Sequence, residues 1–195
     1  MSAVAGNVSD KYGTANPVAR RLVGRFAAEL DALTAQVAPE SLLDVGCGEG
    51  VLTERWARAL APARVVGVDA ADLGGDWARR PAASFAVADA QALPFADGEF
   101  DLVAAIELLE HVEDPGRALA ELTRVAGSHL LVSVPREPLW RALNVARGAY
   151  VRDLGNTPGH RHHWSRRSFV ELLERHGEVV QARSPVPWTM ALVRL

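Results

Sequence analysis

A buried strand that leads into a glycine-rich turn constrains the fold of this chain more than any other feature. Residues 42–50 read Leu-Leu-Asp-Val-Gly-Cys-Gly-Glu-Gly, and residues 41–46 are predicted to form the strand. Glycines remove side chains from the turn, so its backbone can approach a ligand closely. A helix expected over residues 51–60 would direct its first amide groups towards that ligand. The pattern is typical of the first strand–helix unit of dinucleotide-binding folds.

Two other kinds of ligand-binding glycine turn have sequence patterns that differ from this one. A nicotinamide or flavin site has the pattern Gly-x-Gly-x-x-Gly, but here Gly50 comes early and Val51 follows it. A phosphate-binding P-loop needs Gly-Lys-Ser/Thr, and that triplet is absent. Structural turns also use Gly-x-Gly, so the turn does not identify its ligand.

Short apolar segments alternate with helical ones along most of the chain. Four further strands are expected at residues 64–69, 85–88, 100–106 and 129–134, and two closing strands at 178–182 and 188–193. Helices are expected at 17–37, with Asn16 as N-cap, at 115–126, at 139–150, and from Ser165 as N-cap to His176, with a weak helix or turn at 72–80. This alternation indicates an α/β fold with a parallel sheet and helices on both faces.

An acidic residue closes the second predicted strand. Asp69 lies nineteen positions after Gly50, where a carboxylate can accept hydrogen bonds from both hydroxyls of a ribose. The alternative is that Asp69 caps the next helix.

Four ordered motifs within residues 40–135 resemble those of class I S-adenosylmethionine-dependent methyltransferases, in particular the small-molecule, type 11-like group that includes the ubiquinone and menaquinone enzymes. They are the glycine turn at 42–50, the ribose motif at 65–69, the adenine motif at 88–90 with 93–95, and the Phe-Asp-x-Val…Glu-His-Val-x-Asp-Pro stretch at 100–115. The family implies a Rossmann-like, seven-stranded sheet of order 3-2-1-4-5-7-6 with strand 7 antiparallel. It also implies S-adenosyl-L-methionine as cofactor.

The resemblance also assigns cofactor-binding residues. Those expected near the methionine part are Asp44, Gly46, Gly48 and Glu107, and those expected near the nucleoside are Asp69, Ala70, Asp89 and Ala90. Cys47, the single cysteine, is expected to fill space in the turn, because no partner that would activate it is evident.

Three histidines are candidates for proton transfer, because imidazole titrates near neutral pH. His111 follows the Glu107–Glu110 segment, and its alternative role is structural. His160 and His163 lie in a loop, where such residues more often bind ligands than pack. Glu107, Glu110 and His111 also resemble a cation-binding cluster of some quinone-pathway O-methyltransferases, but Glu107 would then have two roles, and no metal is assigned.

An arginine-rich segment lies between Pro138 and Val170. It holds six arginines and a single acid, Asp153, in a chain whose formal net charge is −3. Such segregation can attract an anionic ligand, and the apolar side chains of Leu139, Trp140 and Leu143 lie in the same segment. We therefore expect a small-molecule or lipid-linked acceptor, partly apolar and partly anionic, although a solvated basic face explains the charge equally well.

Length and composition bound the remaining possibilities. The 195 residues suit one domain: a helical segment at 1–40, a cofactor-binding core at 41–135, an acceptor-site insertion at 136–165, and a closing helix and strands at 166–195. The negative charge argues against a general nucleic-acid binder. No apolar run approaches the roughly 18 residues of a membrane span. A cytoplasmic monomer or homodimer is expected, methylating O or N rather than C. The alternatives are an NAD-type oxidoreductase and a non-catalytic cofactor-binding protein.

Overall fold

A computed structural model describes residues 15–61 and 63–195 of the chain. It contains seven strands: β1 (Ser41–Val45), β2 (Arg64–Asp69), β3 (Ser84–Val87), β4 (Phe100–Ile106), β5 (Ala126–Pro135), β6 (Glu178–Arg183) and β7 (Trp188–Arg194). Its helices are α1 (Pro17–Val37), α2 (Val51–Ala59), α3 (Gly74–Trp77), α4 (Pro115–Val125), α5 (Leu139–Ala146) and α6 (Arg166–Leu173), with a 3₁₀ turn, η1 (Val151–Asp153).

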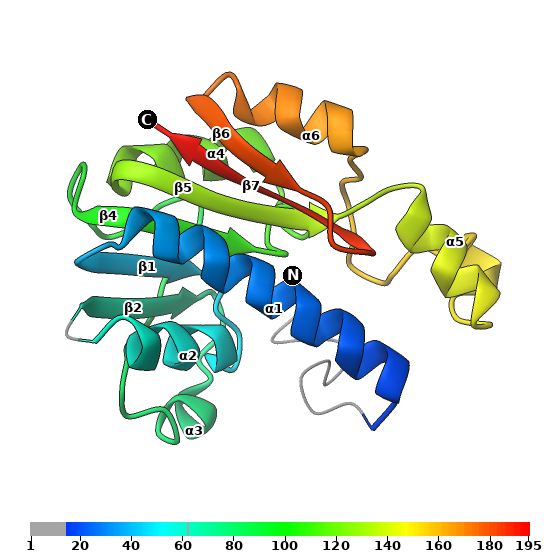
Figure 1. The fold of residues 1–195 in the computed structure, drawn as a ribbon, viewed down its shortest axis with the longest axis horizontal. Helices are drawn as coiled ribbons and strands as arrows, with labels where there is room; N and C mark the ends of the chain where they lie inside the picture. The colour runs from blue at the N-terminus through cyan, green and yellow to red at the C-terminus, as the bar shows by residue number, and fades with distance from the viewer. Residues whose placement is uncertain (1–14, 62) are drawn as a thin grey trace.

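The seven strands form one sheet in the order β3-β2-β1-β4-β5-β7-β6. The pairs from β3 to β5 are parallel, whereas β7 runs antiparallel to both of its neighbours. Figure 1 shows the strands spread out one above another, with α1 crossing in front of the sheet. Helices α4 and α6 pack on the opposite face. The predicted order and the antiparallel seventh strand are both confirmed.

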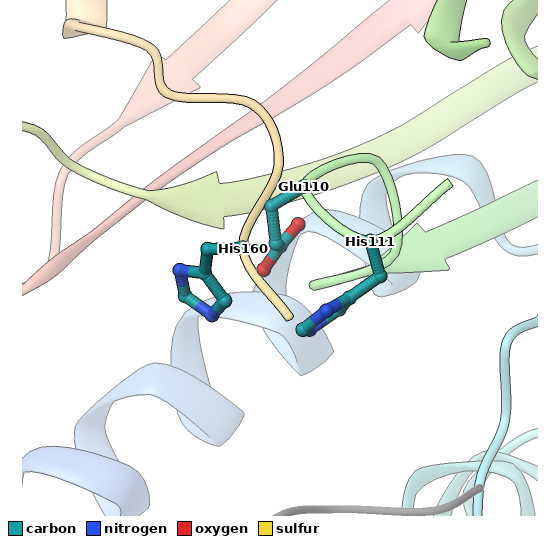
Figure 2. A group of neighbouring side chains, drawn as sticks. All are labelled: Glu110, His111 and His160. Carbon is teal, nitrogen blue, oxygen red and sulfur yellow. The ribbon is translucent and has the colours of Figure 1, made fainter. Parts of the chain in front are cut away.

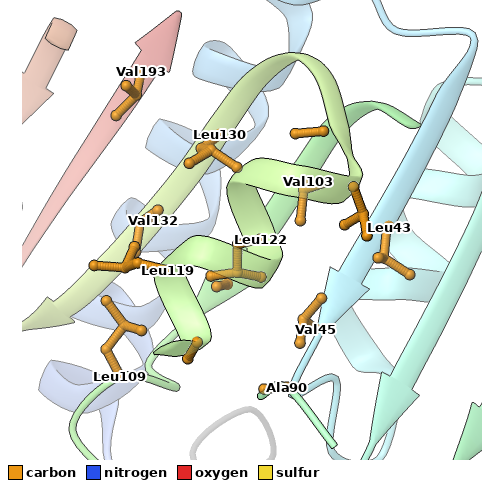
Figure 3. Close-up of a cluster of buried hydrophobic side chains, with 14 of the residues drawn as sticks. Leu43, Val45, Ala90, Val103, Leu109, Leu119, Leu122, Leu130, Val132 and Val193 are labelled. Carbon is orange, nitrogen blue, oxygen red and sulfur yellow. The ribbon is translucent and has the colours of Figure 1, made fainter. Parts of the chain in front are cut away.

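Hydrophobic cores on both faces of the sheet hold the layers together. On one face α4 and α6 cover the central strands through Leu119, Leu122 and Phe169, all fully buried (Figure 3). On the other face α1 and α2 contribute Phe26 and Trp56. Burial on both faces explains why the central strands read as nearly continuous apolar runs.

Polar caps begin the helices where the sequence indicates. The Asn16 side chain accepts hydrogen bonds from the amides of Val18 and Ala19, at 2.9 and 3.2 Å. Ser165 begins α6 in a capping box with Ser168. These caps satisfy amides that have no partner within the helix, and both predicted N-caps are confirmed.

The largest error in the sequence-based prediction concerns α5. The sequence predicts that this helix reaches Tyr150 with Leu139, Leu143 and Ala146 on one apolar face, but it ends at Ala146. Gly148, in the left-handed conformation, and a hydrogen bond from the Ala149 amide to the Asn144 carbonyl turn the chain away. Leu143 is exposed, and Asn144 is the residue of α5 that is buried.

Smaller differences occur at other element ends. Helix α6 ends at Leu173, before a turn over residues 174–176, and the weak helix at 72–80 shrinks to the single turn of α3. Strand β5 begins three residues earlier than predicted, at Ala126, which pairs with Phe100. Within the described residues, no helix is both long and apolar enough to cross a membrane.

Candidate functional site

The glycine turn joins the carboxyl end of β1 to the start of α2. Its first two amides, from Gly46 and Cys47, donate to the Val68 carbonyl of β2 at 2.8 and 3.0 Å. Gly46 and Gly50 both have positive φ, and a Cβ at either would collide with a neighbour, the Leu108 or the Phe85 side chain. The turn is thus a close-packed backbone surface in which glycine is required for both conformation and space.

Asp69 lies directly against this turn. Its Oδ2 accepts from the Gly48 amide at 2.9 Å, and its Oδ1 accepts from the Ala71 amide at 3.0 Å. Asp69 does not cap α3, whose N-cap is Leu73. Because a carboxylate offers about four lone-pair sites, both oxygens retain capacity to accept hydroxyl protons.

Asp44 lies near the end of β1, just before the turn, and Cys47 lies within the turn. The Asp44 carboxylate is buried and accepts from the Thr53 hydroxyl of α2 at 2.6 Å. Burial raises the pKa of the Cys47 thiol well above its usual range, and the negative charges of Asp44 and Asp69 raise it further. The thiol therefore stays protonated at neutral pH and is a poor nucleophile, as expected for a space-filling role.

Trp77 of α3 also reaches the turn, and sequence reasoning missed it. Its indole Nε1 donates to the Gly48 carbonyl at 2.9 Å, and its ring stacks on Phe85 with 5.5 Å between centroids. The contact with Gly48 joins residues 29 positions apart, so periodicity gives no signal for it. The only sign of this contact in the sequence is that a tryptophan follows the Gly74-Gly75 pair, a few residues after Asp69.

The predicted adenine-binding residues lie at the same edge of the sheet. The Ala88 amide donates to the Asp69 carbonyl at 2.9 Å, so the chain that follows β3 passes beside the end of β2. Asp89 next forms a tight turn by accepting from the Gln91 amide at 2.9 Å, and Ala90 is buried. The structure therefore brings Asp69 and Asp89 to neighbouring strand ends.

Glu107 occupies an unusual backbone conformation just beyond β4. Its φ is 54°, a value that residues other than glycine seldom adopt. Its Oε1 accepts from the Trp188 indole at 2.7 Å, which links the ends of β4 and β7. Non-glycine residues held in this region cluster at functional sites.

Two of the three candidate histidines meet beside Glu110 (Figure 2). The His111 and His160 rings contact edge to face, with 4.9 Å between centroids, and ligand atoms of Glu110, His111 and His160 lie within 4.8 Å of one another. Such a group can hold a divalent cation. This group contains His160 in place of Glu107, which the sequence groups with Glu110 and His111.

The third histidine lies in a different pair. His163 Nδ1 is 3.6 Å from Glu137 Oε1. His160 also stacks on Trp140, whose ring lies 5.8 Å from that of Trp188. An aromatic row therefore runs from the start of β7 to the histidine pair.

Comparison with known proteins gives consistent results. A family model described as a methyltransferase domain matches residues 43–130. The chain is 30% identical over 196 residues to a ubiquinone biosynthesis O-methyltransferase of Ruegeria pomeroyi, covering 90% of this chain and 76% of that protein. A demethylmenaquinone methyltransferase of Renibacterium salmoninarum is 35% identical, covering 77% of this chain and 65% of that protein. The chain belongs to the class I S-adenosylmethionine-dependent methyltransferases.

A structural comparison supports the same fold. The magnesium protoporphyrin IX methyltransferase of Synechocystis with bound SAH superposes with a TM-score of 0.68 at 19% identity, covering 93% of this chain and 89% of that one. The chain spans 35% and 40% of the length of two other curated relatives. Membership of the methyltransferase family argues against the alternative of an NAD-type oxidoreductase.

A pH-dependent stability follows from the environment of His160. Burial, together with a smaller effect of the positive charge of a protonated His111, lowers the pKa of His160 from the usual 6.5 to about 4. Below pH 6.5 the unfolded chain binds a proton that the folded protein does not, so the free energy of unfolding falls as pH drops from 6.5 towards 4. After allowance for solvent screening, this loss is on the order of 1 kcal/mol at pH 5.

Urea unfolding of the wild type and of His160→Gln, at pH 7 and at pH 5, measures this effect. The stability difference between wild type and variant should shrink on acidification, because the variant lacks the titrating group. Stability curves that stay parallel between the two pH values would contradict it.

Proposed function

We propose that this protein transfers the methyl group of S-adenosylmethionine to a small-molecule acceptor. The observation that supports this most strongly is the contact of Asp69 with the Gly48 amide. It joins the acid at the end of β2 to a turn with no room for side chains. A nucleoside needs a paired acceptor for its ribose and a flat backbone surface beside it, and this arrangement fits both needs.

The cofactor-binding assignment follows the strand ends. Gly46 and Gly48, supported by the buried Asp44, would lie against the methionine part. Asp69 with Ala70 would bind the ribose, and Asp89 with Ala90 the adenine. Glu107 would lie near the methionine part, oriented by its bond from the Trp188 indole. When bound, S-adenosylmethionine supplies an electrophilic methyl group on a sulfonium.

The chain's main task is then to align the acceptor and exclude water. We assign His111 as the proton acceptor for a hydroxyl or ammonium group, which favours O- or N-methylation. Its Nδ1 lies 3.2 Å from the Gly159 carbonyl; if Nδ1 donates there, the lone pair of the ring resides on Nε2. His160 remains uncharged at neutral pH and holds the His111 ring edge-on. His163, beside Glu137, is the second candidate base.

We assign residues 136–165 to acceptor binding, with 41–135 holding the cofactor. Trp140 and Trp188 offer flat apolar faces beside the histidine pair, which suits an acceptor with a planar ring. The Arg161 amide donates to the Glu110 carbonyl at 2.8 Å, so the backbone of Arg161 lies next to the pair of His111 and His160. Relatives named for ubiquinone biosynthesis and demethylmenaquinone methylation support a small acceptor of this kind.

Isothermal titration calorimetry with S-adenosylhomocysteine tests the cofactor assignment. Asp69→Asn leaves one acceptor oxygen and removes the charge, so affinity should fall about 10- to 100-fold, the usual cost of losing hydrogen bonds to a charged group. The matched control is Asp72→Asn, because exposed Asp72 forms the same kind of turn by accepting from the Gly74 amide. Wild-type affinity in Asp69→Asn, or an equal loss in both variants, would refute the assignment.

Arginine substitutions test the acceptor assignment. Replacing exposed Arg161 and Arg166 with Ala should raise the acceptor KM about tenfold for a phenolic carboxylate, with ~0.7 kcal/mol lost per charged contact. The KM for an uncharged phenol and the affinity for S-adenosylhomocysteine should not change. Arg175→Ala, just beyond α6, is the control. Equal effects on the charged and uncharged acceptors would rule out recognition of an anion. Failure of the wild type to methylate any acceptor would favour the non-catalytic alternative.

A further inference from the structure

Helix α5 buries a polar residue and exposes most of its apolar ones. Its buried residue is the amide Asn144, which is 3% exposed. The Asn144 Nδ2 donates to the Gly155 carbonyl at 2.8 Å and to the Thr157 hydroxyl at 3.1 Å. Trp140, one turn earlier on the same side, packs against the core cluster that contains Trp188. The inner side of the helix therefore carries a hydrogen-bonded amide and a half-buried tryptophan.

The outer side of α5 is apolar. At about 100° per residue, the positions opposite Asn144 are those two before it, two after it and five before it, flanked by its immediate neighbours. Those residues are Leu139, Ala142, Leu143, Val145 and Ala146. Leu143 and Val145 are 39% and 43% exposed, and we call the five helix residues the apolar face. In the loop that follows the helix, Val151 and Leu154 are 53% and 72% exposed.

Specific contacts hold the apolar face outward. Arg141 Nε donates to the Leu154 carbonyl at 3.0 Å, and Trp140 Nε1 donates to the Thr157 hydroxyl at 2.9 Å. A Cβ at Gly155 would collide with the Arg141 carbonyl, so α5 and the returning loop are in close contact. Figure 1 shows α5 standing away from the sheet, at the end where β4 and β5 terminate. The exposure of the apolar face is thus maintained by the contacts between α5 and the loop that follows it.

Two exposed arginines follow the apolar face in the chain, with one exposed acid, Asp153, next to the second. Arg147 and Arg152 are exposed, and their side chains form no hydrogen bond or ion pair with the described residues. The start of α1, with Arg20, Arg21 and the exposed Val18, lies at the same end of the molecule. The combination is apolar contact area with unneutralised cationic charge beside it.

We propose that the apolar face docks on the surface of a bilayer that contains anionic phospholipid. A helix lying in the interface buries its apolar side among the acyl chains while arginines attract the negative headgroups. A symmetric dimer through this face would bring the arginines of two copies together, which costs energy. Nucleic acid would neutralise the arginines but leave Leu143 and Leu154 in water. The bilayer satisfies both features, and the proposal does not depend on the identity of the methyl acceptor.

Co-sedimentation with vesicles tests the proposal on the full chain. The wild type should bind vesicles of mixed phosphatidylcholine and phosphatidylglycerol, should bind pure phosphatidylcholine much more weakly, and should dissociate as salt rises. Arg147→Gln with Arg152→Gln should weaken binding about thirtyfold, since each arginine near an anionic surface contributes about 1 kcal/mol. Leu143→Gln with Val145→Gln should also weaken it. The matched control is Val180→Thr with Arg175→Gln, which alters an exposed apolar residue of β6 and an exposed arginine elsewhere.

Each alternative has its own result. No binding of the wild type to anionic vesicles, or equal binding by the two test variants and the control, would overturn the proposal. So would light scattering that shows a dimer lost in Leu143→Gln/Val145→Gln, or tighter binding to duplex DNA than to vesicles. Wild-type affinity for S-adenosylhomocysteine in every variant shows that they are folded. It also separates failure of this proposal from failure of the proposed function.

Discussion

Three hydrogen bonds between the ends of β1 and β2 hold the rest of the site in place. The Gly46 and Cys47 amides bond to the Val68 carbonyl, and the Gly48 amide bonds to the Asp69 carboxylate. Together they position the turn against the acid at the end of the neighbouring strand. Since the carboxyl ends of parallel strands share one edge of a sheet, Asp89 and Glu107 lie at the same edge as the turn.

The central part of the fold was predictable because local and global signals agree there. The segment 41–69 shows buried strands, a turn that only glycine fits, and a closing acid, and each of these follows from chemistry within a few residues. The caps at Asn16 and Ser165 are local in the same sense. The order of the sheet followed from the family resemblance, because periodicity alone does not give the neighbours of β7.

Features built from distant residues were not predictable. Trp77 reaches Gly48, and Trp188 reaches Glu107, through tertiary packing that leaves no periodic signal. For α5, the sequence predicts an amphipathic helix with one apolar face, but it does not predict which residue packs inward. The structure buries Asn144, whose partners Gly155 and Thr157 lie on the returning loop. A hydrophobic pattern indicates that a face will be covered, but it does not say whether the protein itself covers it.

A crystal structure with S-adenosylhomocysteine bound tests the central claim most directly. The account predicts that both ribose hydroxyls donate to the Asp69 carboxylate while the homocysteine part lies along the backbone of Gly46 and Gly48. A nucleoside bound elsewhere, or bound with its ribose away from Asp69, would contradict it.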